Sequence, residues 1–216
     1  LVGTGVAGDY DTIQSAIAYA IGVGGGTIYI APGTYYLAGA VTIPMSINLY
    51  SPDREAVLIH GSVTDGDYLK PTPDTVTGQA QQTFTNITFV NDGGGILYSP
   101  TTQLDGSQEV VFQNCNFTGG GTYVKTILQK TTLNYCTVAV GGNAAFLVEV
   151  SFTLSFTSIN RYASSATMIV RDTNPDTAEI ASVYIYNSII NGGAVTNGRY
   201  FPSESLEEII IQNSII

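Results

Sequence analysis

The sequence lacks tryptophan, contains one histidine and two cysteines, and is poor in positive charge. Seven Lys and Arg residues stand against 17 Asp and Glu residues, which gives a formal net charge of −10. This charge repels phosphate backbones and argues against nucleic-acid binding. Charged residues make up 11% of the 216 residues and hydrophobic residues 44%, a composition that argues against intrinsic disorder. No uninterrupted apolar run is long enough for a membrane-spanning helix.

The sequence does contain an internal repeat. Its six segments read apolar, polar, central residue, small or apolar, variable, apolar, and they are 84–89, 112–117, 133–138, 154–159, 185–190 and 211–216. The central residues follow one another at intervals of 21 to 31 residues, and they are Asn86, Asn114, Tyr135, Phe156, Asn187 and Asn213. A fixed unit separated by loops of free length is typical of a solenoid.

Apolar and polar residues alternate on both sides of each central residue, and the phase of the alternation changes there. This pattern predicts two strands that meet at a tight bend. Asn tolerates a left-handed backbone, and stacked Asn side chains can form an amide ladder, which Tyr135 and Phe156 interrupt. A third strand per turn is predicted from the segments 95–98, 123–127, 145–150 and 167–170.

Three strands per turn predict an all-β fold, a parallel β-helix of about eight or nine turns that forms a single domain over residues 1–216. A capping α-helix is predicted at about residues 10–22, with Asp11 or Thr12 as its N-cap and Gly22 at its end. Early strands are predicted at 27–30, 41–43 and 47–50. The sequence stops at Ile216 inside a strand-like unit, so we expect the natural protein to continue or another chain to cover that end.

Two stretches near the N-terminus carry a family resemblance. They read Gly-Asp-Tyr-Asp-Thr-Ile-Gln-Ser-Ala-Ile over 8–17 and Gly-Gly-Thr-Ile-Tyr-Ile-Ala-Pro-Gly-Thr-Tyr over 25–35. With the repeated Asn-x-x-Phe units, they resemble the pectin-lyase-like superfamily. The resemblance implies a right-handed parallel β-helix, found in polysaccharide lyases, polygalacturonase-type hydrolases and phage tailspikes. It does not specify one function, because the superfamily contains both enzymes and inert scaffolds.

Cys115 and Cys136 each follow the central residue of consecutive repeats, so both side chains are expected to point inward. They form either a pair of buried thiols or one disulfide, and the spacing between stacked strands favours the thiols. No Cys-x-x-Cys spacing is present, which argues against a structural zinc site. His60 and Gly61 resemble the His-Gly pair of polygalacturonase-like enzymes, but no adjacent aspartates precede them here, so His60 is predicted to be a strand-end or surface residue.

No lyase motif matches residue by residue, so no catalytic residue is carried over from the family. The first catalytic candidates are Arg171, Asp172 and Asp176, which follow a predicted strand and offer a base beside carboxylates. Asp65 and Asp67 form the best candidate for a Ca²⁺ site, against the alternative of a solvated turn. No other cofactor is predicted. Lys125 and Glu149 lie on neighbouring turns and are expected to form at most a surface ion pair.

Fourteen tyrosines supply surfaces for sugar rings. The candidates for glycan binding are Tyr98, Tyr123 and Tyr184, with Tyr162 and Tyr186 also predicted to point outward. The same side chains serve equally well to pack under loops or against another subunit.

The preferred functional hypothesis is a non-catalytic extracellular or virion module of the spike, fibre or decoration type. It would assemble with other copies or other chains and bind surface glycans. The missing catalytic constellation and the high apolar content motivate this hypothesis. The alternative is a polysaccharide lyase or glycoside hydrolase that acts on an acidic polysaccharide.

Overall fold

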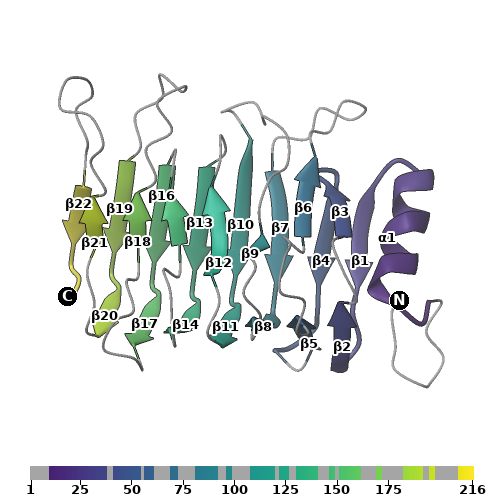
Figure 1. Ribbon diagram of the computed structural model, residues 1–216, viewed down its shortest axis with the longest axis horizontal. Helices are drawn as coiled ribbons and strands as arrows, with labels where there is room; N and C mark the ends of the chain where they lie inside the picture. Colours follow the sequence, from purple (N-terminus) through teal and green to yellow (C-terminus); the bar gives the residue numbers. More distant parts are fainter. Residues whose placement is uncertain are drawn as a thin grey trace.

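The chain winds as a coil of parallel strands with one helix at its N-terminal end (Figure 1). The computed structural model describes residues 10–37, 41–54, 56–60, 69–72, 81–91, 96–98, 108–119, 122–126, 130–140, 146–148, 151–161, 169–171, 182–191, 195–197 and 209–216. Each strand pairs with the equivalent strand one turn along the coil, so three parallel sheets run along its length. The predicted parallel β-helix is therefore confirmed.

The first sheet has eight strands. They are, in order, β1 (Gly26–Tyr29), β4 (Ile47–Tyr50), β7 (Gln81–Thr85), β10 (Glu109–Gln113), β13 (Lys130–Asn134), β16 (Ser151–Ser155), β19 (Ser182–Tyr186) and β22 (Ile209–Gln212). The second sheet has seven strands, β2 (Gly33–Leu37), β5 (Ala56–His60), β8 (Ile87–Asn91), β11 (Asn116–Gly119), β14 (Thr137–Val140), β17 (Ser158–Arg161) and β20 (Ile189–Asn191).

The third sheet also has seven strands. They are β3 (Val41–Pro44), β6 (Leu69–Thr72), β9 (Ile96–Tyr98), β12 (Thr122–Thr126), β15 (Phe146–Val148), β18 (Ile169–Arg171) and β21 (Val195–Asn197). The third-strand predictions agree with β9, β12, β15 and β18 within a few residues. The described buried residues of the three sheets form one hydrophobic core.

Single residues in the left-handed region make the bend between the first and second sheets. The six central residues of the repeat all have φ between 48° and 57°, and they are Asn86, Asn114, Tyr135, Phe156, Asn187 and Asn213. A left-handed residue turns the chain sharply, which explains why the side-chain alternation changes phase there. The predicted bends are confirmed at all six positions.

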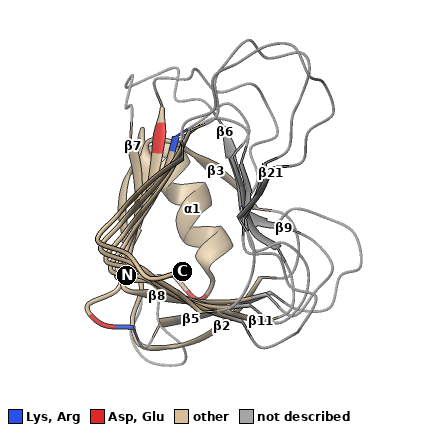
Figure 2. Cartoon of the chain, turned by 90° about the vertical axis from the view of Figure 1, so that its left-hand side faces the viewer, with Lys and Arg blue, Asp and Glu red and all other residues tan. Residues whose placement is uncertain are grey.

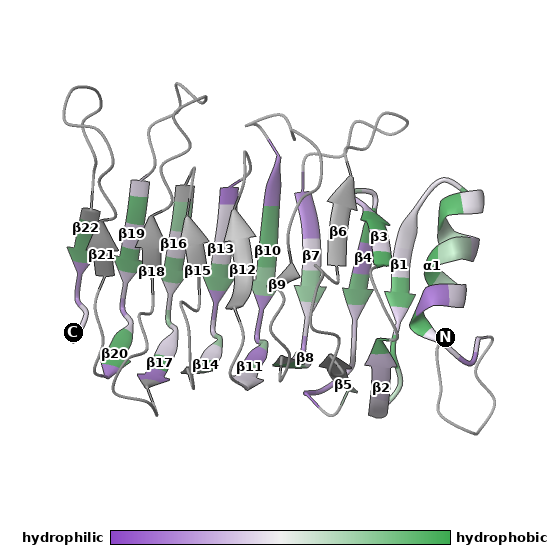
Figure 3. Cartoon of the chain, in the orientation of Figure 1, coloured by the Kyte–Doolittle hydropathy of each residue, from purple (hydrophilic) through white to green (hydrophobic). Residues whose placement is uncertain are grey.

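Equivalent inward side chains stack from turn to turn. Phe84 pairs in register with Phe112, and their rings lie 5.0 Å apart at 14°. Phe89 and Phe117 stack in the same way on the second sheet, 5.3 Å apart at 19°. The register continues both columns through buried aliphatic residues, namely Leu133, Leu154, Ile185, Val138, Ile159 and Ile190. Figure 3 shows hydrophobic residues within the strands of the first sheet and hydrophilic residues at several of the bends.

A polar column lies inside the core directly after the bend. It contains the buried residues Cys115, Cys136, Thr157 and Ser188. The Thr157 hydroxyl donates to the carbonyls of Leu133 and Ser155 and accepts from the Cys136 amide. The Thr157 amide in turn donates to Ser188 Oγ at 3.1 Å. The column thus satisfies backbone groups that the bend removes from the sheet ladders.

The capping helix α1 spans Ile13–Gly22 and contacts β1, β2, β3 and β4 at the end of the coil. Thr12 is the N-cap, because its side-chain oxygen accepts from the Ser15 amide at 3.1 Å. The buried face of α1 consists of Ile13, Ala16, Ile17 and Ala20. The helix therefore covers the apolar interior, as predicted.

Candidate functional site

The catalytic candidates fall at the edge of the described chain. Arg171 is the last residue of β18, and its backbone pairs with Val148 and Asn197. Asp172 and Asp176 lie outside the described residues, as do Asp65, Asp67 and Glu149. His60 is the last residue of β5, at a strand end as predicted. The catalytic and Ca²⁺ proposals therefore stay predictions.

The tyrosine candidates divide between two sheets. Tyr98 lies in β9 of the third sheet and pairs with Val124, whereas Tyr123 precedes Val124 by one residue, so the two tyrosines do not share a register position. Tyr184 lies in β19 of the first sheet, and Tyr162 lies outside the described residues. The tyrosine whose surroundings the structure describes is thus Tyr184.

Tyr184 belongs to an outward surface that runs the length of the first sheet. We call it the outer face of the first sheet. The strand register builds this face from two columns of side chains. The first column is Thr27, Asn48, Thr83, Val111, Thr132, Thr153, Tyr184 and Ile210. The second column is Tyr29, Tyr50, Thr85, Gln113, Asn134, Ser155, Tyr186 and Gln212. Hydroxyl and amide side chains make up most of it.

Tyrosine pairs lie toward both ends of this face. Tyr29 and Tyr50 pack edge to face, with ring centroids 5.4 Å apart, and Tyr29 is 54% exposed. Tyr184 and Tyr186 lie side by side on β19 with ring planes 14° apart. Tyr50 and Tyr186 are five turns apart in one column, a span of about 24 Å at the usual strand spacing.

The two columns of the outer face contain no charged residue, and two charged residues lie beside them on β10 and β13. Glu109 and Lys130 are the charged residues in the eight strands of the first sheet, and they lie in register beside each other (Figure 2). Glu109 accepts hydrogen bonds from Gln81 and from Thr132, which holds its carboxylate within the polar network. Asn134 donates to Gln113 at 2.9 Å. The face is thus a neutral array of donors and acceptors between aromatic rings.

A second exposed feature lies at the bend between the first and second sheets. The rings of Tyr135 and Phe156 stack 4.9 Å apart at 6°, and each side chain is 49% exposed. Beside them Asn114 donates to Asn86 Oδ1 at 2.7 Å, which is one step of the predicted amide ladder. Arg54 donates to the carbonyl groups of Asn114 and Tyr135 and to the side-chain oxygens of Asn114 and Asn116.

Sequence reasoning did not find Arg54. Its bond partners lie 60 to 81 residues away, and the loop that carries it has no counterpart in the repeat. The sequence did contain one signal for such a residue. Because Tyr135 stands where other turns have Asn, the side-chain oxygen of Asn114 needs a hydrogen-bond donor from elsewhere in the chain. An arginine supplies several donors in a planar fork, which suits that position.

The two cysteines are buried free thiols, as the strand geometry favoured. Cys115 Sγ contacts the carbonyl oxygen of Phe84 at 3.4 Å, and Cys136 Sγ contacts that of Phe112 at 3.2 Å. Burial, with a hydrogen bond to Cys136, raises the pKa of the Cys115 thiol well above its usual value. A raised pKa and full burial make Cys115 an unreactive core residue.

Comparison with solved structures gives two matches, both of pectin methylesterase from Aspergillus niger. One is the deglycosylated form, with a TM-score of 0.59 and 15% identity over 99% of this chain and 84% of that one. The other retains an N-acetylglucosamine stub, with a TM-score of 0.59 and 16% identity over 97% and 84%. The fold is the right-handed, pectin-lyase-like parallel β-helix. Sequence identities of 15% and 16% establish a common fold and nothing further.

No protein-family model matches the chain, and no curated protein does. Among the described residues, no group of three or more His, Cys, Asp or Glu side chains could hold a metal ion. Within the same residues, no helix has both the length and the apolar character needed to cross a bilayer. The fold is shared with pectin methylesterase, an enzyme that acts on a carbohydrate. Within this fold, the outer face of the first sheet is the candidate binding surface.

Proposed function

We propose that this protein binds and acts on a polysaccharide that lies along the outer face of the first sheet. The observation that carries the proposal is the neutral row of hydroxyl and amide side chains between the pairs Tyr29–Tyr50 and Tyr184–Tyr186. Sugar rings stack on aromatic side chains and exchange hydrogen bonds with such groups. The fold likeness to pectin methylesterase supports a carbohydrate ligand.

The charge of the protein narrows the range of polysaccharides that it can bind. A net charge of −10 and an outer face without charged residues, flanked by one carboxylate (Glu109) and one ammonium group (Lys130), give no attraction for a dense polyanion. The bound stretch is therefore a neutral glycan, or a uronate polymer whose carboxyl groups are esterified. This proposal replaces the acidic polysaccharide expected in the alternative hypothesis from the sequence.

Binding can be measured by isothermal titration against neutral glucans, mannans and xylans, methyl-esterified pectin and de-esterified polygalacturonate. We expect the variant Tyr184→Ala/Tyr186→Ala to weaken binding by about tenfold or more. Tyr36→Ala is the matched control, because Tyr36 is 69% exposed but lies on β2 of the second sheet. Equal affinity of the double variant and the wild type would contradict the proposal.

The reaction class is tested on the polymers that bind. Unsaturated uronate products absorb ultraviolet light and indicate a lyase, new reducing ends indicate a hydrolase, and released methanol indicates an esterase. Arg171→Ala tests the sequence-based catalytic candidate, and Arg171→Lys retains the charge as its control.

A second candidate function is a non-catalytic module of an extracellular or virion surface that binds glycans and assembles with other chains. The absence of a lyase motif that matches residue by residue in the sequence motivates it. Binding without turnover on every polymer, with an assembly larger than one chain in light scattering, would support this candidate. Extracellular placement fits both candidates, since the matched fungal enzyme is described in deglycosylated forms.

A further inference from the structure

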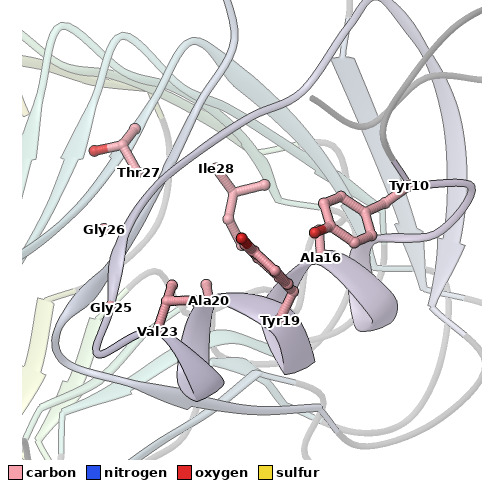
Figure 4. A pocket seen from close by; sticks show the side chains of 9 residues that line it. All are labelled: Tyr10, Ala16, Tyr19, Ala20, Val23, Gly25, Gly26, Thr27 and Ile28. Carbon is pink, nitrogen blue, oxygen red and sulfur yellow. The ribbon is translucent and has the colours of Figure 1, made fainter.

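A pocket opens between the capping helix α1 and the first strand β1 (Figure 4). Its volume is about 520 Å³, within the range of small-ligand sites. The described lining residues are Tyr10, Ala16, Tyr19, Ala20, Val23, Gly25, Gly26, Thr27 and Ile28. None of them is charged, and their side chains combine an apolar floor with hydroxyl groups.

Two tyrosine rings form one side of the pocket. The rings of Tyr10 and Tyr19 lie 5.4 Å apart and are tilted by 39°. Figure 4 shows both rings on the same side of α1, with their hydroxyl groups directed toward the side where Ile28 lies. Tyr19 is 57% exposed, while α1 covers the core through the buried Ile13 and Ile17. Capping of the coil therefore does not require the ring of Tyr19.

Glycine backbone forms the opposite side. Gly24, Gly25 and Gly26 have φ values of 91°, 105° and 129°, which side chains rarely adopt. A Cβ atom on Gly25 would lie 2.7 Å from Ser46 Cβ, whereas a Cβ on Gly26 would meet nothing within 4 Å. The amides of Gly25 and Gly26 donate to the carbonyls of Ala20 and Ser46, so the loop is held in place. A ligand can approach this bare, fixed backbone closely.

The pocket adjoins the outer face of the first sheet. Thr27 lines the pocket and also begins one outward column, in register with Asn48. Tyr29, two residues further along β1, carries the first ring of the tyrosine pair at this end of the face. A polymer that lies along the face therefore reaches the pocket at the N-terminal end of the coil.

We propose that this pocket binds the terminal sugar unit of a neutral glycan chain whose following units lie on the outer face of the first sheet. The inference rests on the proposed function and adds an end-specific subsite to it. The uncharged lining disfavours an ionic ligand. The hydroxyl groups of the tyrosines and Thr27 suit a ligand with its own hydroxyls, and the ring of Tyr19 offers a stacking face.

The test uses the full chain and neutral oligosaccharides of glucose, mannose and xylose, each with free ends or with one end blocked by a bulky aglycone. We expect Tyr19→Ala to weaken binding of the free-ended ligand by about tenfold. Blocking the end that enters the pocket should weaken wild-type binding to the same degree and make Tyr19→Ala silent. Tyr36→Ala is again the control, as an exposed tyrosine of the second sheet.

Methyl-group NMR locates the bound end directly. The methyl signals of Ala16, Ala20 and Ile28 report on the pocket floor and should shift with the free-ended oligosaccharide. If an oligosaccharide binds, loses affinity in Tyr184→Ala/Tyr186→Ala and leaves these signals unmoved, the pocket proposal is wrong and the proposed function stands. If the signals shift but that double variant binds normally, the pocket holds the ligand and the proposed placement along the face is wrong. If no glycan binds the wild type, both proposals are overturned.

Discussion

The side-chain oxygen of Asn114 accepts a hydrogen bond from Arg54 where the amide ladder reaches its last Asn before the aromatic pair. On one side, Asn114 donates to Asn86, which donates to the Ser51 carbonyl at 2.8 Å. On the other side, the next turn carries Tyr135, which has no side-chain amide. Arg54 supplies the missing donor and also bonds the Tyr135 carbonyl. It thus ends the ladder and links the loop after β4 to the bends after β10 and β13.

Replacement of Arg54 should lower the free energy of unfolding. Arg54→Met leaves two backbone carbonyls and two side-chain oxygens without their donor. We expect a loss of about 2 kcal/mol, measured by chemical denaturation. Lys130→Met is the control, since Lys130 is exposed, and it should change stability by less than about 0.5 kcal/mol. A loss at Arg54 no larger than this control would show that the bonds contribute nothing.

Because Tyr135 lies at a left-handed bend, the stability of a variant at this position should depend on how readily the new residue adopts a left-handed backbone. Tyr135 has φ of 55°, a conformation that Asn adopts readily and β-branched residues avoid. Tyr135→Asn should change stability by no more than about 1 kcal/mol, the value of the lost stacking on Phe156. Tyr135→Val should cost about 1–2 kcal/mol more, because strain is added to the same loss. Thermal denaturation of both variants measures the difference.

Thr137→Val provides the comparison for this pair. Thr137 is exposed on β14 in an ordinary strand, so a β-branched residue fits there without strain. Equal stability of the Asn and Val variants at position 135 would refute the argument from the left-handed backbone.

Two buried threonines should respond in opposite directions to the same substitution. Among the described residues, the hydroxyl of Thr131 is buried without a hydrogen-bond partner, between Val110 and Phe152 in register. Thr131→Val should therefore raise the free energy of unfolding by about 1 kcal/mol. Thr157→Val should lower it by about 2 kcal/mol, because the Thr157 hydroxyl bonds three backbone groups. Effects of the same sign from urea titrations of the two variants would contradict this reasoning.

The raised pKa of Cys115 predicts a loss of stability in alkaline solution. Burial keeps this thiol protonated in the folded state, while an unfolded thiol ionises near its ordinary pKa of 9.0. The folded state therefore retains a proton that the unfolded state releases, and stability falls as the pH rises above that value. Cys115→Ser should show a smaller fall than the wild type between about pH 7 and about pH 10. Equal slopes in the two proteins would rule out this contribution.

Local signals in the sequence were sufficient to predict the coil. The change of phase at Asn86 and its equivalents marks a left-handed bend, and the two-residue alternation around it fixes which side chains stack. Tyr184 and Tyr186 were predicted outward for the same reason, and they alternate with the buried Val183 and Ile185. Once the repeat is found in the sequence, it therefore predicts which side chains are buried in the interior and which lie on the outer face.

Two features outside the period were not predicted. Arg54 lies in a loop without an equivalent in other turns, and its partners are distant in sequence. The pocket under α1 depends on the fold of the Gly24–Gly26 loop against Ser46, which no spacing in the sequence announces. Both features arise where a unique segment meets the repeating coil, so no local pattern in the sequence marks them.

The polar column behind the bends also bears on how such a coil changes length. The Cys136 amide reaches the hydroxyl of Thr157, and the Thr157 amide reaches that of Ser188, so each layer is completed by a side chain of the layer after it. A whole layer can then be duplicated or deleted as a module, provided its neighbour offers a hydroxyl or thiol at that place. Duplication of a single layer would then require the hydrogen bonds of this column to be re-formed only at the new junction.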